Sequence, residues 1–332
     1  MIIGFRAWSF SIPRISHHVP NASDSALPPD VTNTAVTVGT FDGVHRGHQF
    51  ILSALASAAK DRDLKSLLIT FEPHPLEIVN PTAAPLLLTV GDEKLEVIAE
   101  SGIDYFAVVP FTRALANLEA EEFVRDVLCG RFRMQYLMMG HDHGFGRNRS
   151  GNAATMQMLA KEIGFEVDVR PPIGIGDGPP VSSTAIRRAI AGGDLQRARL
   201  ALGRFYSVSG RVIQGEQRGA ALGFRTINVP LPSHRKLLPP FGVYAVHVQT
   251  PHGPFGGMLN LGGRPTFGDE RPLLEAHLFD VTLDLYDAPV RIDFVSRMRD
   301  TMRFASPEAL RAQLQQDERL ARELLRENVQ TT

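Results

Sequence analysis

Cysteine is nearly absent from this sequence of 332 residues, in which Cys129 is the only one. One cysteine cannot form an internal disulfide, and no CxxC pair or Cys/His ladder accompanies it. An excess of one charge is also absent, because 35 Lys and Arg residues stand against 36 Asp and Glu residues. There is thus no global positive field to attract nucleic acid or an anionic membrane. These absences predict a cytoplasmic protein that binds neither.

Long hydrophobic runs are missing as well. The first twelve residues, MIIGFRAWSFSI, form a short apolar stretch that Arg6 interrupts, and no basic residue precedes it, so we expect no signal peptide. Elsewhere no run approaches the roughly 20 apolar residues that cross a bilayer. At roughly 150 residues per domain the length predicts two domains. We expect a monomer or a weak homo-oligomer.

Strand-like and helix-like segments alternate through the first part of the chain. This alternation is typical of a doubly wound α/β domain, in which helices cover both faces of a parallel sheet. We place that domain at residues 35–203, after an irregular N-terminal extension at 1–34. The expected strands are 35–39, 65–71, 105–111, 136–140 and 165–172, and the expected helices are 48–60, 92–101, 119–130 and 152–163.

The pattern changes from about residue 205, where short strands with period-two alternation are separated by turns. Leu274, Ala276 and Leu278 illustrate that alternation. Five or six such strands suggest a small antiparallel β-barrel. A long amphipathic helix follows, with Ser306 as its N-cap and proline in its first position. We assign residues 204–332 to this second domain.

The stretch GTFDGVHRGH, residues 39–48, links the first expected strand to a helix. Ligands of an open α/β sheet bind at the carboxyl ends of its strands. The glycines let the backbone approach a ligand closely, and the helix N-terminus offers free amides, which suits phosphate. His45 and His48 could donate to phosphate oxygens, bind zinc, or cap the helix, and their spacing alone leaves these three interpretations open.

Two common nucleotide motifs do not occur. The GxxxxGK[ST] pattern of a P-loop is missing, and GFGRNRSG at 144–151 lacks the glycine spacing of a dinucleotide fingerprint. A P-loop kinase and an evident dehydrogenase are therefore excluded.

The stretch GTFDGVHRGHQ resembles the GxFDGxHxGHQ signature of the bifunctional riboflavin kinase/FMN adenylyltransferase family, whose members belong to the HxGH nucleotidylyltransferase superfamily. Further segments resemble the same family in the same order, and the resemblance runs from about residue 35 to about residue 325. These segments are TFEPHP (70–75), PFTRALANLEAEEFV (110–124), VSSTAIR (181–187), GFRTIN (223–228), GVYAV (242–246), LNLGGRPTFG (259–268) and EAHLFD (275–280).

The resemblance implies that the first domain adenylylates FMN to FAD with ATP and releases pyrophosphate. It implies that His45 and His48 are catalytic and contact the ATP phosphates. The implied ATP-binding residues also include Gly39, Phe41, Asp42, Gly43, Ser182, Ser183, Thr184 and Arg187. Those expected to line the flavin pocket are His74, Asp142 and Arg149.

For the second domain the resemblance implies a riboflavin kinase-like barrel that makes FMN from riboflavin and ATP. The family's PTAN motif is RTIN here, which would place Thr226 and Asn228 at a magnesium ion and the phosphates of ATP. Glu275 matches the general base that accepts the proton of the riboflavin hydroxyl. Judged without the resemblance, Glu275 is a polar residue facing away from Leu274 and Ala276.

The chain departs from the family pattern at two places. Arg225 and Ile227 replace the proline and alanine of PTAN, and His143 and Gly144 replace a phenylalanine and an arginine of GxDFRFG. The first departure keeps open the alternative that only the adenylyltransferase works and the kinase module is degenerate. A third alternative is a regulator that binds flavin without catalysis.

Overall fold

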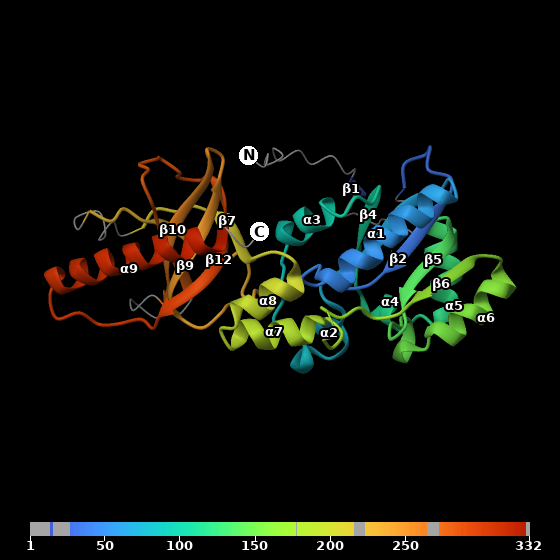
Figure 1. Ribbon diagram of the computed structural model, residues 1–332. Coiled ribbons are helices and arrows are strands. Elements are labelled where there is room, and N and C mark those ends of the chain that lie inside the picture. The colour runs from blue at the N-terminus through green and yellow to red at the C-terminus, as the bar shows by residue number, and fades with distance from the viewer. Residues whose placement is uncertain (1–13, 16–26, 177, 216–222, 264–271, 330–332) are drawn as a thin grey trace. The chain divides into compact units, whose positions relative to one another are not determined.

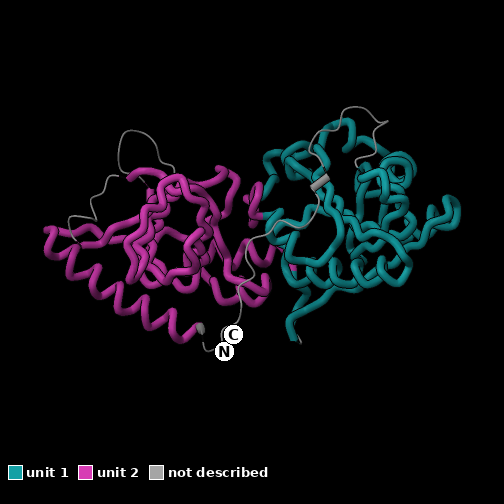
Figure 2. Tube along the Cα trace, turned by 90° about the horizontal axis from the view of Figure 1, so that it is seen from above, with its two compact units in different colours: residues 1–85, 94–181 teal, residues 86–93, 182–332 magenta. Residues whose placement is uncertain are grey.

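The computed structural model describes residues 14–15, 27–176, 178–215, 223–263 and 272–329. The chain forms two compact units, drawn in different colours in Figure 2. Unit 1 comprises residues 1–85 and 94–181, and unit 2 comprises residues 86–93 and 182–332. The helices between residues 183 and 202, which the sequence analysis placed in the first domain, thus pack within unit 2.

The described strands of unit 1 form a six-stranded sheet in the order β1-β4-β3-β2-β5-β6, and every pairing is parallel. The chain moves outward from β2 through β3 to β4 and then crosses to β5 on the other side of β2, so the switch point lies between β2 and β5. The strands are β1 (Arg14–Ile15), β2 (Thr34–Val38), β3 (Lys65–Glu72), β4 (Tyr105–Pro110), β5 (Met134–Gly140) and β6 (Glu166–Arg170). Strand β1 lies within the segment expected to be irregular.

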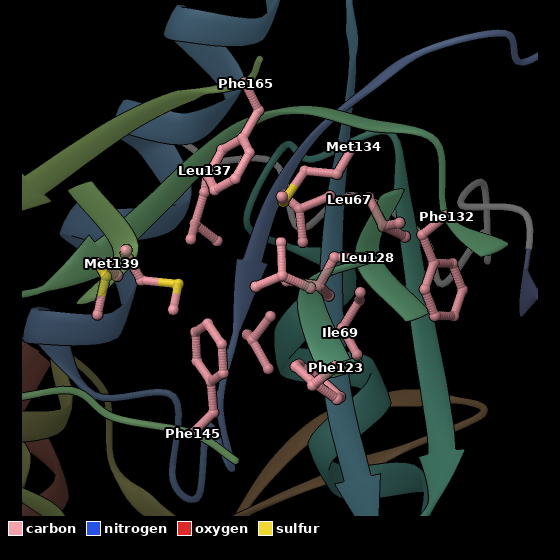
Figure 3. Close-up of a cluster of buried hydrophobic side chains, with 14 of the residues drawn as sticks. Leu67, Ile69, Phe123, Leu128, Phe132, Met134, Leu137, Met139, Phe145 and Phe165 are labelled. Carbon is pink, nitrogen blue, oxygen red and sulfur yellow. The ribbon is translucent and has the colours of Figure 1, made fainter. Parts of the chain in front are cut away.

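Helices cover both faces of this sheet, as Figure 1 shows. On one face Leu67 and Ile69 of β3 pack with Phe123 and Leu128, in the core drawn in Figure 3. The intervening Leu68 points to the opposite face. The helices are α1 (Arg46–Asp61), α2 (Pro75–Val79), η1 (Pro81–Ala83), α3 (Asp92–Ala99), α4 (Arg113–Asn117), α5 (Ala120–Glu122), the π-helical η2 (Phe123–Arg131), η3 (Arg147–Arg149) and α6 (Ala153–Ile163). The predicted doubly wound α/β fold is confirmed.

The described strands of unit 2 form an antiparallel sheet in the order β7-β12-β9-β10-β11-β8. A bridge between Ile213, just beyond β7, and Asn228 on β8 joins the two ends of that order, so the sheet curls into a barrel. The strands are β7 (Tyr206–Arg211), β8 (Ile227–Pro230), β9 (Gly242–Thr250), β10 (Gly253–Gly263), β11 (Pro272–Leu278) and β12 (Pro289–Arg299). The antiparallel barrel predicted from period-two alternation is confirmed.

The C-terminal helix α9 (Pro307–Val329) packs on the sheet through Ala321 and Leu325, and Ser306 caps it. Two shorter helices, α7 (Ser183–Ala191) and α8 (Leu195–Leu202), complete the helices of unit 2. Among the described residues, none of the helices combines the length and the apolar character needed to cross a membrane.

Residues 86–93 are held inside unit 2, although they come from the N-terminal half of the chain. Leu87 forms a parallel bridge with Lys236, with backbone hydrogen bonds on either side. Lys236 Nζ lies 2.6 Å from Glu93 Oε2 and donates to the carbonyl of Leu88 at 2.8 Å. Both charged side chains are almost fully buried, with exposures of 1% and 5%. A buried ion pair therefore anchors this segment.

Candidate functional site

The loop between β2 and α1 lies at the carboxyl end of the central strand, at the switch point of the sheet. Its backbone turns sharply, with positive φ at Phe41 (46°), Gly43 (80°) and Val44 (36°). Left-handed backbone costs energy at non-glycine residues, so the surroundings must hold it in place. The side chains of Phe41 and Val44 are buried in the core beneath α1, and this packing keeps the loop backbone in its left-handed conformation. The structure thus fixes this loop at the place where ligands bind in such sheets.

The two histidines of the loop lie together. His45 is the N-cap of α1, and its Nδ1 accepts a long hydrogen bond from the backbone amide of His48 at 3.4 Å. The two rings stack with centroids 3.7 Å apart, and Phe41 lies 4.7 Å from the His48 ring. An accepting Nδ1 carries no proton, so the neutral His45 ring carries its proton on Nε2 and can donate there. Capping and phosphate binding are therefore compatible in one histidine.

Two glycines leave room for this arrangement. A Cβ at Gly47 would lie 3.1 Å from the His45 ring, and it would approach the carbonyl of Val181 to 3.8 Å. A Cβ at Gly39 would lie 3.0 Å from the Phe41 ring and 3.5 Å from Cε1 of His143. The absence of side chains at both positions therefore lets the rings come close to the backbone.

The loop after β5, residues 141–152, meets the first loop at this point, as the approach of His143 to Gly39 shows. The pKa of His143 is lowered to about 4, chiefly by burial and also by the Arg149 cation, while Asp142 opposes the shift. The imidazole is therefore neutral at physiological pH. Arg149 also donates from Nη2 to the backbone carbonyl of Asp142 at 2.8 Å, which closes the loop on itself. The structure brings Asp142 and Arg149 together.

His74 has a local structural role. It is the N-cap of α2, where its Nδ1 accepts from the amide of Leu76 at 3.2 Å, and Glu77 completes a capping box. This satisfies amides at the helix start that would otherwise lack partners. The expected place of His74 in the flavin pocket stays a prediction.

A third group near the first loop was missed by sequence reasoning. Lys94 on α3 donates from Nζ to Thr70 Oγ1 at 2.5 Å, and Thr70 donates to the carbonyl of Thr40 at 3.1 Å. Burial lowers the pKa of Lys94 to about 8, while Asp42 and Glu72 oppose that shift. Lys94 had no recognisable signal, because a single lysine on an amphipathic helix is typical of any solvated face.

The segment containing Ser182, Ser183, Thr184 and Arg187 lies at the start of α7 in unit 2. Ser182 is its N-cap, and its hydroxyl accepts from the amide of Ala185 at 3.3 Å. Arg187 donates from Nε to the carbonyl of Leu86 at 2.9 Å, which ties α7 to the segment 86–93.

Unit 2 places a row of polar residues across three neighbouring strands. Asn228 on β8 pairs directly with Glu275 on β11, and Glu275 pairs on its other side with Asn260 on β10. Asn260 Nδ2 donates to the Glu275 carboxylate at 3.4 Å. Thr226 is exposed just before β8, two residues ahead of Asn228. The structure therefore brings Asn228 and Glu275 together, and Asn260 is an addition that the sequence did not reveal.

His277, two residues beyond Glu275 on β11, contacts the backbone just before β8. Its Nδ1 lies 2.7 Å from the carbonyl oxygen of Arg225, and its ring packs edge-on against Phe224, with centroids 5.2 Å apart. An amide oxygen can only accept, so the ring nitrogen donates. Asn228 itself sits against Gly215, where a Cβ would lie 2.0 Å from its amide nitrogen. Only glycine fits there.

The donor set near Asn228 suits a hard cation. A threonine hydroxyl and an asparagine amide are oxygen ligands of the kind that Mg²⁺ accepts, alongside phosphate oxygens and water. Among the described residues, no group of three His, Cys, Asp or Glu side chains could hold a metal ion by itself. Any metal here would thus depend on the substrate for most of its ligands.

Two protein families match the two parts of the chain. Residues 27–185 match the FAD synthetase family, and residues 202–325 match the riboflavin kinase family. A protein of Escherichia coli strain K12, named bifunctional riboflavin kinase/FMN adenylyltransferase, is 40% identical over 289 residues, covering 87% of this chain and 91% of that protein. A protein of the same name from Pseudomonas fluorescens is 37% identical and covers 90% of this chain and 95% of its own length.

A solved structure resembles the whole chain. It is described as a macrolide-efflux protein from Streptococcus pneumoniae, and it is 29% identical with a TM-score of 0.80, covering 92% of this chain and 97% of that chain. The similarity therefore extends over both units.

Proposed function

Because the chain belongs to the bifunctional riboflavin kinase/FMN adenylyltransferase family, we propose which of its residues carry each of the two activities. The protein phosphorylates riboflavin to FMN and adenylylates FMN to FAD. The assignment of adenylyl transfer rests on the pair of stacked imidazoles, His45 and His48, at the N-terminus of α1 beside the switch point. The assignment of the kinase activity rests on the row of Asn228, Glu275 and Asn260.

In adenylyl transfer a phosphate oxygen of FMN attacks the α-phosphorus of ATP, and pyrophosphate leaves. His45 and His48 donate to the triphosphate oxygens and stabilise the charge that grows on them, and the amides at the start of α1 add to this. Gly39, Phe41, Asp42 and Gly43 shape the loop around the nucleotide. The protein forms no covalent intermediate, so alignment and charge stabilisation supply the catalysis.

We also assign ATP binding to the segment at the start of α7. Ser182, Ser183 and Thr184 provide hydroxyls and helix amides, and Arg187 provides a cation with several donors for phosphate. The support is the N-terminal position of these residues on a helix and the match of the segment to the family. His74, Asp142 and Arg149 are assigned to the walls of the flavin pocket.

In the kinase reaction the terminal hydroxyl of the ribityl chain attacks the γ-phosphorus of a second ATP. Glu275 accepts the proton of that hydroxyl, and Asn260 orients its carboxylate. Thr226 and Asn228 hold magnesium with the ATP phosphates, and that ion neutralises phosphate charge when bound. The departure at Arg225 does not displace this row, because the His277 contact is to its backbone carbonyl and its side chain is exposed. We therefore favour a working kinase over a degenerate one.

The proposal also covers the cellular compartment and the assembly state of the enzyme. We assign it to the cytoplasm, as a monomer or weak homo-oligomer that does not bind nucleic acid. The net charge of -1 and the single, partly buried Cys129 support this assignment.

One experiment separates the two sites. Purified protein is incubated with ATP, magnesium and either riboflavin or FMN, and the flavins are resolved by chromatography. His48→Ala should lower FAD formation about 10²- to 10³-fold and let FMN accumulate. Glu275→Gln should lower FMN formation about 10²- to 10⁴-fold but leave the conversion of added FMN intact.

Two exposed positions supply matched controls. His252→Ala and Glu323→Gln remove a histidine and a glutamate that the assignment does not use, so both variants should retain both activities. If His48→Ala or Glu275→Gln abolished both steps in a folded protein, the two-site assignment would be refuted.

A further inference from the structure

Lys94 reaches the carboxyl end of the central strands of unit 1 from outside the loops that carry the known motifs. It lies in the first turn of α3, and its ammonium donates to Thr70 Oγ1 at 2.5 Å. Thr70 is fully buried near the end of β3, and its hydroxyl proton is directed to the carbonyl of Thr40 at 3.1 Å. The lysine is therefore joined to the backbone of the GTFDG loop through a single threonine.

This ammonium is poorly satisfied by the protein. An ammonium has three N–H donors, and the described part of the chain shows one hydrogen-bond acceptor for them, Thr70 Oγ1. Asp42 and Glu72 attract the charge from farther away without a hydrogen bond to it among the contacts seen. The residue as a whole is only partly buried. Two N–H donors thus have no protein acceptor among the described residues.

Holding this charge has an energetic cost. Burial lowers the pKa of Lys94 from 10.5 to about 8, so the folded state binds its proton less tightly than the unfolded chain does. At pH 7 the lysine is still mainly protonated, and its desolvation lowers the free energy of unfolding. A cation that destabilises the folded protein has a functional explanation if an anionic substrate accepts hydrogen bonds from its remaining N–H groups.

We propose that Lys94 binds a phosphate oxyanion of the adenylyl-transfer substrates, with Thr70 holding its ammonium beside the GTFDG loop. This rests on the proposed assignment of adenylyl transfer to that loop. The oxyanion belongs either to the phosphate of FMN or to the triphosphate of ATP, which present the same chemistry. If the oxyanion belongs to FMN, the KM for FMN depends on Lys94, and if it belongs to ATP, the KM for ATP does.

The test compares Lys94→Met, Lys94→Arg and a control, Lys65→Met, which removes an exposed lysine at the opposite end of β3. Lys94→Met should lower kcat/KM for FAD formation about 10- to 100-fold, the size expected for a charge-assisted hydrogen bond. Lys94→Arg should recover at least part of that loss. A raised KM for FMN would assign the contact to the flavin phosphate, and a raised KM for ATP would assign it to the triphosphate.

Stability distinguishes this role from a structural one. Lys94→Met removes a desolvated charge, so its Tm should equal or exceed that of the unmodified protein, and FMN formation from riboflavin should be unchanged. A loss of FAD formation accompanied by a lower Tm would overturn the proposal, as would full FAD formation by Lys94→Met. His48→Ala measured in parallel separates the two ideas: if it loses FAD formation while Lys94→Met keeps it, only the role of Lys94 fails.

Discussion

The buried ion pair between Lys236 and Glu93 should make a large contribution to the stability of unit 2. The perturbation is Lys236→Met, which keeps an unbranched side chain as far as Cε and removes the ammonium group with its charge. Lys236 Nζ lies 2.6 Å from the Glu93 carboxylate and 4.6 Å from the centre of the Tyr206 ring. Glu93 would remain buried without its cation.

The size of the effect follows from what Glu93 retains. Removing one partner of a buried pair costs about 3–5 kcal/mol, because the remaining charge is uncompensated. Glu93 would still accept from the amides of Ser209 at 2.7 Å and Val90 at 3.2 Å, which places the loss near the lower end of that range. At about 2–4 °C per kcal/mol for a domain of this size, we expect Tm to fall by about 6–12 °C.

Differential scanning calorimetry measures this change, and the thermal loss of kinase activity identifies the transition of unit 2. Exposed Lys65→Met is the control and should shift Tm by less than about 2 °C. The double variant Lys236→Met/Glu93→Gln removes both charges and keeps an acceptor for Ser209, so it should recover part of the loss. A single variant as stable as the control, or a double variant less stable than the single one, would refute this reasoning.

Two further predictions concern histidines near the two sites. Chiefly through burial, the pKa of His143 falls to about 4 from an ordinary 6.5. Between these two pH values the unfolded chain binds a proton at this histidine and the folded protein does not. The free energy of unfolding therefore decreases as the pH drops through this range. In His143→Phe the decrease in Tm between pH 7 and pH 5 should therefore be smaller, by about 4–8 °C for roughly 2 kcal/mol, and an equal decrease would contradict this. His277→Leu removes the donor to the carbonyl of Arg225 at 2.7 Å and should raise the KM for ATP in the kinase reaction about 10-fold. His277→Asn keeps a donor and should stay near the unmodified value, so equal kinetics for both variants would exclude this role.

Much of the fold could be predicted because it depends on local patterns. Leu67 and Ile69 alternate with Leu68, and the two sets lie on opposite faces of the sheet, as expected for a strand buried on both sides. The barrel strands followed from the same period-two rule applied to Leu274 and Ala276, which are fully buried. Such patterns do not show which segment joins which core, so the place of residues 86–93 in unit 2 could not be predicted.

The site was predictable where one short segment carries it. His45 and His48 are three residues apart, so the helix that begins at Arg46 brings their rings together without help from elsewhere. Asn260 and Glu275 are separated by a whole strand connection, and their contact depends on the register of β10 with β11. Register follows from hydrophobic patterning over a complete sheet, and a motif does not report it.

By itself, the sequence determined the class of each unit, the family, the pair of activities and the loop that carries the histidines. Each of these depends on residue type and on spacing within a segment, which are properties of the chain before it folds. Tertiary structure alone decided that Lys94 reaches the carbonyl of Thr40 through Thr70, and that Lys236 neutralises Glu93 far away in the chain. The pKa of Lys94 depends on which groups exclude water around its ammonium. Those groups come from segments that are distant in the sequence, so they surround the ammonium only once the chain has folded.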